Sequence, residues 1–288
     1  MLVRGPSPAL RPFVHVLWAS EPSVGPAAQG GALPWERMLP SGRAHVVLRL
    51  TGPSLRLLAA DTSRSPQVIR RAVVGGPRTS AYAKEAARGA ETVGAQLSVG
   101  ATRALLGVPG RALAGVHVPL DEVLGPVSES WCDELHALPS ARARLLRFQA
   151  LLTERLSDHA PHAVVQHGIA RLSDPLAAVS VQALVSESGY SHRRFLDLFE
   201  ESTGVTPKRF ARVVRFRATL AALQRGAGGA GLGRVEKEGV RLAALASQLG
   251  YADQAHLTRE FRAHTGITPA RYQLAEPHQL YHLPLPAP

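Results

Sequence analysis

An internal repeat in the last third of the chain constrains the fold more than any other feature of the sequence. Residues 179–210 and 240–272 match at an offset of 61 positions, with Gly189 and Tyr190 aligned to Gly250 and Tyr251. Further on, Thr-Gly-Val-Thr-Pro at 203–207 matches Thr-Gly-Ile-Thr-Pro at 265–269, after a gain of one residue. A repeat of this length predicts two copies of one supersecondary unit.

Each copy has the residue order expected of two short helices joined by a tight turn. A short apolar helix ends at Gly189 in the first copy and at Gly250 in the second. Glycine adopts positive φ without steric cost, which suits it to end a helix. A second helix begins a few residues later, so each copy is expected to be a helix-turn-helix.

The second helix of each copy has an apolar face and a polar face. Phe195 and Phe199 in the first copy, like Leu257 and Phe261 in the second, have helical spacing and are expected to face the core. A solvated helix surface would give the same polar face, so this pattern alone does not establish a function. Seven positions on or beside this face are called the polar-face positions: His192, Arg193, Leu196, Asp197, Gln254, Thr258 and Arg259.

The second copy carries a longer motif. It reads Gly-Tyr-Ala-Asp-Gln-Ala-His-Leu-Thr-Arg-Glu-Phe at 250–261 and Thr-Gly-Ile-Thr-Pro-Ala-Arg-Tyr at 265–272. On these residues, segment 169–273 resembles the DNA-binding domain of the AraC/XylS family. The resemblance implies a sequence-specific transcription regulator whose two recognition helices read successive major grooves of double-stranded DNA. It also implies base contacts from the seven polar-face positions and phosphate contacts from Ser191, Arg194, Lys208, Arg209 and Arg212.

A linker helix between the two units is expected over 207–223. This segment starts with Pro207, a favoured first-turn residue, and runs 17 residues without another proline or any glycine. As a helix it would span roughly 26 Å. Major grooves on one face of duplex DNA recur about every 34 Å, so such a helix could hold two recognition helices at adjacent grooves.

The sequence departs from the family pattern at two places. A glycine-rich insertion at 226–233 is expected to couple the two units less rigidly. Asp197, Glu200 and Glu201 also place negative charge on the first recognition helix, where the family commonly has basic residues. The second unit is therefore expected to be the better base reader.

The first 120 residues favour β-structure. Short apolar stretches broken by Gly and Pro occur at 13–18, 44–50, 55–59, 72–74, 92–99 and 114–118. They predict a barrel-like or sandwich-like domain over 1–126. Pro-Ser-Gly at 40–42 before a strand, and Val-Gly at 99–100 before Leu-Leu-Gly at 105–107, resemble an uncharacterised regulatory domain of the same family. That resemblance implies a small-molecule effector or a homodimer, and the family makes RNA polymerase another candidate partner.

The remaining segments complete an α+β organisation. An amphipathic helix is expected over 141–157, within a helical connector at 127–166, and segment 159–167 is interpreted as a linker that leads into the next domain. The all-α DNA-binding domain is placed at 167–275. The last stretch, 276–288, contains four prolines and no core pattern, and is expected to be a disordered tail.

Composition narrows the functional classes only partly. The formal charge of +11 suits nucleic acid, but it would also suit an anionic membrane surface. With one cysteine, Cys132, no intrachain disulfide can form, and no run of 18 apolar residues occurs. We therefore expect a cytoplasmic protein without a membrane span.

An enzymatic constellation is not found in the sequence. His159, His162 and His167 are spaced too loosely for a zinc site. His45 and His117 lie in expected strands, where a structural role is more common than a ligand-binding one. We expect no enzyme activity, cofactor or metal. Two other hypotheses stay open, a ligand-binding or enzymatic barrel with a vestigial C-terminal domain and a nonspecific nucleoid-type binder.

Overall fold

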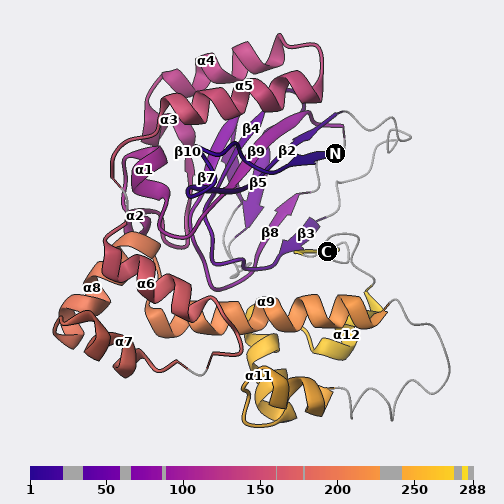
Figure 1. Cartoon of the computed structure of the whole chain (residues 1–288). Helices are drawn as coiled ribbons and strands as arrows, with labels where there is room; N and C mark the ends of the chain where they lie inside the picture. Colours follow the sequence, from indigo (N-terminus) through magenta and orange to yellow (C-terminus); the bar gives the residue numbers. More distant parts are fainter. Residues whose placement is uncertain are drawn as a thin grey trace.

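The computed structural model describes residues 1–21, 35–58, 66–85, 89–159, 161–177, 179–227, 242–275 and 281–284. A β-rich N-terminal domain lies on an all-helical C-terminal domain, and two helices cover the far side of the N-terminal domain (Figure 1). This arrangement confirms the expected α+β fold. Within the described ranges, no helix combines the length and apolar character needed to cross a membrane.

The N-terminal domain contains two antiparallel sheets. The described strands do not close into a barrel, so the sandwich-like alternative fits better. One sheet has the order β1 (Leu2–Arg4), β2 (Val14–Ser20), β9 (Thr92–Leu97), β4 (His45–Arg49), β7 (Ala72–Gly75) and β10 (His117–Pro119). The other has the order β11 (His282–Pro284), β3 (Trp35–Met38), β8 (Tyr82–Glu85), β5 (Leu55–Leu58) and β6 (Gln67–Ile69).

Helices of the N-terminal domain pack on the first sheet. The helix expected over 141–157 is α5 (Ala141–Glu154), capped by Ser140, whose hydroxyl accepts from the Ala143 N–H. Its Phe148 is fully buried in one core with residues of β2, β4 and β9. The expected connector is therefore part of the N-terminal core. The other helices are α1 (Thr102–Leu106), α2 (Gly110–Leu113), α3 (Leu120–Leu124) and α4 (Val127–His136).

The C-terminal domain begins earlier than expected. Helix α6 (Ala163–Leu172) occupies most of the segment interpreted as a linker. Its Val165 and Leu172 are buried with Phe195 and Phe199 of the first helix-turn-helix unit, so α6 belongs to that unit. The helices that follow are α7 (Val181–Ser188), α8 (His192–Thr203), α9 (Pro207–Ala227), a helical segment at 242–248, α11 (Gln254–Thr265) and α12 (Pro269–Leu274).

The expected disordered tail is wrong for residues 281–284. Strand β11 pairs antiparallel with β3, and Leu283 is only 3% exposed. The Tyr281 hydroxyl accepts a hydrogen bond from Nε of Arg217 at 3.2 Å. Proline is tolerated in an edge strand, so the composition of the tail did not exclude this pairing. The other residues of 276–288 lie outside the described part of the chain.

Candidate DNA-binding surface

The two helix-turn-helix units are built in the same way from local signals. Gly189 and Gly250 adopt positive φ values of 70° and 72° where the first helix of each unit ends. The side chains of Ser191 and Asp253 then accept hydrogen bonds from the backbone N–H of the third residue of the next helix, Arg194 and His256 respectively. These caps satisfy helix donors that would otherwise lack partners, and they fix where α8 and α11 begin.

The repeated Thr-Gly turn also has equivalent geometry in both copies. The Oγ1 atom of Thr203 lies 2.8 Å from the carbonyl oxygens of Phe199 and Val205. The Oγ1 atom of Thr265 lies 2.9 Å and 2.8 Å from the carbonyl oxygens of Phe261 and Ile267. The equivalence predicted from sequence is therefore confirmed at the level of hydrogen bonds.

Helix α9 joins the two units and extends beyond the expected 207–223. Its 21 residues span about 31 Å. Phe210 and Val214 are buried against the first unit, while Phe216 and Leu220 are buried against the second. The predicted linker helix is confirmed. Residues 228–233 of the glycine-rich insertion lie outside the described residues.

The predicted base-reading residues occupy the outer surfaces of α8 and α11. Leu257 and Phe261 of α11 are 0% and 1% exposed, as expected for the core face. Arg259 is exposed on the other side, with Gln254 and Thr258 half-buried beside it. On α8, His192, Arg193 and Asp197 are exposed and Leu196 is half-buried.

Four of the five predicted phosphate contacts are exposed, but Arg212 departs from the prediction. Ser191, Arg194, Lys208 and Arg209 lie on the surface. The Nε and Nη2 atoms of Arg212 each donate to the Glu260 carboxylate at 2.7 Å. This bidentate pair holds α9 to α11 and uses two of the five N–H donors of the guanidinium, so a phosphate would compete with Glu260 for Arg212. Linear spacing did not reveal it because the partners are 48 residues apart.

Family models match both domains. A "Helix-turn-helix domain" model matches residues 184–275, and a "Domain of unknown function (DUF6597)" model matches residues 3–119. The first covers both recognition helices and the linker helix described above. The chain is a DNA-binding transcription regulator of the AraC type. Its β-rich half is matched by the model of unknown function.

Solved structures with similar folds include two of ToxT from Vibrio cholerae. An apo ToxT variant is 10% identical with a TM-score of 0.48, over 94% of this chain and 99% of that one. ToxT bound to (E)-4-(8-methylnaphthalen-1-yl)but-3-enoic acid is 11% identical with a TM-score of 0.45, over 90% and 97%. The C-terminal domain of AraT, a response regulator from Geobacillus stearothermophilus, is 12% identical with a TM-score of 0.34, over 42% and 92%. The search of curated proteins gave no match.

Sequence reasoning missed that the N-terminal domain of this AraC-type chain contacts both DNA-binding units. Nη1 of Arg37 donates to the Thr265 carbonyl at 2.7 Å, and Nδ1 of His264 lies 2.7 Å from the Thr79 carbonyl oxygen. Arg111 of α2 reaches the carbonyl and the carboxylate of Asp197 on α8. The acidic departure on α8 was visible in the sequence, but its partner was not.

The histidines considered for zinc are separated in the AraC-type fold. His159 lies beside Ser157, and His167 lies beside Glu187. His162 accepts from the Val164 N–H at the start of α6. Among the described residues, no group of three or more His, Cys, Asp or Glu side chains could hold a metal ion.

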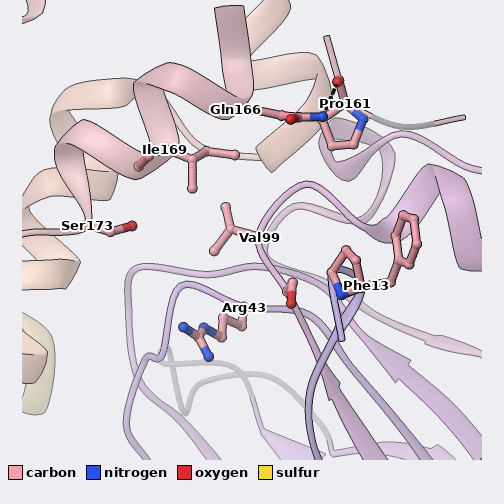
Figure 2. A pocket seen from close by; sticks show the side chains of 10 residues that line it. Phe13, Arg43, Val99, Pro161, Gln166, Ile169 and Ser173 are labelled. Carbon is pink, nitrogen blue, oxygen red and sulfur yellow. Dashed lines mark hydrogen bonds between the residues drawn. The ribbon is translucent and has the colours of Figure 1, made fainter. Parts of the chain in front are cut away.

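A pocket of about 380 Å³ lies between the N-terminal domain and α6 of this AraC-type chain. Figure 2 shows Ile169 of α6 and Ser173, the residue after its end, across the pocket from Arg43 and Val99 of the N-terminal domain, with Phe13 farther along the same wall. Nε and Nη1 of Arg43 are buried, and none of the described residues accepts a hydrogen bond from them. Burial and the nearby positive charge of Arg217 lower the pKa of Arg43 to about 10, so its guanidinium stays charged at neutral pH.

Proposed function

We propose that this non-catalytic regulator works in the cytoplasm and reads its operator mainly through α11. The observation that supports this is the environment of Arg259. It lies opposite the buried Leu257 and Phe261, and no side chain in the described part of the chain pairs with it. A free guanidinium on a recognition helix can make bidentate contact with the O6 and N7 atoms of guanine. On α8, the exposed N-terminal residues His192 and Arg193 would read the other groove.

Replacing Arg259 with Ala tests the assignment of the reading surface. We expect the variant to lose about 1–3 kcal/mol of binding free energy on the cognate site and much less on random DNA. The cognate site is first located by footprinting upstream of the protein's own and neighbouring genes. Gel shifts on cognate and random DNA at several salt concentrations measure both affinities.

Lys208→Ala is the matched control for Arg259→Ala because Lys208 is also exposed and is assigned to phosphate. It should weaken binding to both DNAs by similar factors and make the salt slope shallower by about one unit. If Arg259→Ala weakens both DNAs equally while circular dichroism shows intact helices, Arg259 is a phosphate contact and the proposed reading surface is wrong.

We further propose that the pocket at Arg43 binds an amphipathic organic acid as the effector. The volume of about 380 Å³ is within the range of small-molecule sites, and Phe13, Val99 and Ile169 supply apolar walls. The buried Nε and Nη1 donors of Arg43 have no acceptor among the described residues, and a carboxylate would provide one. Residues of both domains line the pocket, so the affinity of a ligand there depends on how the domains are placed relative to each other. A bound ligand would therefore increase the population of the domain arrangement that binds it more tightly.

Decanoate and its uncharged analogue decanol serve as probes of this pocket. At 100 times its Kd, decanoate should stabilise the folded chain by about 2.7 kcal/mol, which a thermal melt detects. Arg43→Leu should abolish that stabilisation, whereas Arg142→Leu, an exposed substitution on α5, should retain it. Equal stabilisation by decanol and decanoate would exclude carboxylate recognition by Arg43.

A further inference from the structure

The acidic side of the first recognition helix faces two arginines of the N-terminal domain. We propose that Arg103 and Arg111 complete the first DNA-binding unit by reducing the net charge of the cluster Asp197, Glu200 and Glu201 from −3 to −1, so that α8 can approach the phosphate backbone. This inference rests on the proposed role of α8 in entering a DNA groove. It makes the first unit a composite of both domains.

The contacts between the two domains pair every carboxylate of this acidic cluster. Nη2 of Arg111 lies 3.7 Å from Oδ1 of Asp197 and 3.7 Å from Oε2 of Glu200. The same nitrogen donates to the Asp197 carbonyl at 3.3 Å. Nη2 of Arg103 lies 2.8 Å from Oε1 of Glu201. Two guanidinium groups from one domain thus compensate three carboxylates of the other.

Close backbone packing holds α2, which carries Arg111, against the end of α8. A Cβ atom on Gly110, the first residue of α2, would lie 2.4 Å from the Ser202 carbonyl oxygen. A Cβ atom on Gly204, which has a φ of 76°, would lie 2.6 Å from the Gly110 carbonyl oxygen. Figure 1 shows the end of α8 next to α2. The ion pairs therefore form on an interface that only glycine permits at these two positions.

Electrostatics explains why the neutralisation matters for DNA. Duplex DNA carries one negative charge per roughly 1.7 Å of its axis, so carboxylates without partners on an inserted helix are repelled. The basic residues of α8, Arg193 and Arg194, lie at its N-terminal end and do not pair with the acidic cluster. The side chains of Arg103 and Arg111 are 44% and 47% exposed, so both can also approach phosphates.

The same contacts would have the opposite effect if α2 held α8 away from DNA. The two effects predict opposite signs when the arginines are removed. Neutralisation predicts weaker DNA binding, while obstruction predicts tighter binding. Charge compensation also predicts rescue when the carboxylates are removed as well.

The test uses the full chain and the footprinted cognate site. The double variant R103A/R111A should bind about tenfold more weakly at low salt, with a smaller difference at high salt. Adding E200Q and E201Q to that variant, which leaves the predicted base-reading residue Asp197 in place, returns the cluster to its original net charge and should restore the affinity to within about threefold of the original protein. The double variant R70A/R142A is the control, since it removes two exposed arginines outside the α2–α8 contact. Thermal melts establish that all variants are folded.

Three outcomes overturn the inference. Tighter binding by R103A/R111A would show that α2 obstructs DNA, and unchanged binding would show that the ion pairs only join the domains. A loss equal to that of R70A/R142A, without rescue, would show an effect of net charge alone. If the original protein binds no site better than random DNA, the proposed function itself fails, which the first gel shift reveals.

Discussion

Acidification from pH 6.5 to 4.5 is expected to lower the free energy of unfolding by about 3–5 kcal/mol, through two histidines of the N-terminal domain, the half-buried His45 and the buried His117. Burial, with the nearby positive charge of Arg78, lowers the pKa of His45 to about 4 and that of His117 to about 2. Both imidazoles have an ordinary pKa near 6.5 in the unfolded chain. Below pH 6.5 the unfolded state therefore binds protons that the folded state does not, and stability falls as the pH falls.

Denaturant titrations at pH 6.5, 5.5 and 4.5 measure this slope. His117→Gln should flatten it by about half, since each histidine contributes up to about 1.4 kcal/mol per pH unit. His159→Gln, an exposed substitution, should leave the slope unchanged. The hydrogen bond from His282 lowers the pKa of Glu36 to about 2, so its contribution begins to be lost near pH 4.5 and adds only a small decrease at the end of this window. An unchanged slope in His117→Gln would contradict the assignment.

Truncation of Phe216 to Ala is expected to cost about 3–5 kcal/mol of unfolding free energy. Phe216 is fully buried on α9, with its ring 5.5 Å from that of Phe261 and 4.8 Å from that of His264. Removing the ring leaves a cavity where the linker helix meets the second recognition helix. The orientation of α11 depends on this packing, so we also expect weaker binding to the cognate site.

Urea unfolding followed by far-ultraviolet circular dichroism measures the loss. Arg225→Ala lies on the exposed surface of the same helix and should change the unfolding free energy by less than about 0.5 kcal/mol. A loss below about 1 kcal/mol for Phe216→Ala would mean that the α9–α11 core contributes little to stability.

The sequence by itself determined the features that depend on residues close together in the chain. Gly189 and Gly250 ended helices, and the Ser191 and Asp253 caps started α8 and α11, because a cap is satisfied within a few residues. The helical spacing of apolar residues placed α5, α8 and α11, and Pro207 at the start of a run without further proline or glycine placed α9. The repeat therefore predicted the DNA-binding architecture directly.

Tertiary structure alone decided which distant groups meet. The tail strand β11 pairs with β3 across nearly the whole chain, Arg212 meets Glu260 instead of remaining free for a phosphate, and the acidic side of α8 meets Arg103 and Arg111. The sign of a charge does not identify its partner, and the three-residue strand β11 lies in a proline-containing tail without a strand pattern. These contacts depend on the packing of separate elements, so local propensity and periodicity carry no information about them.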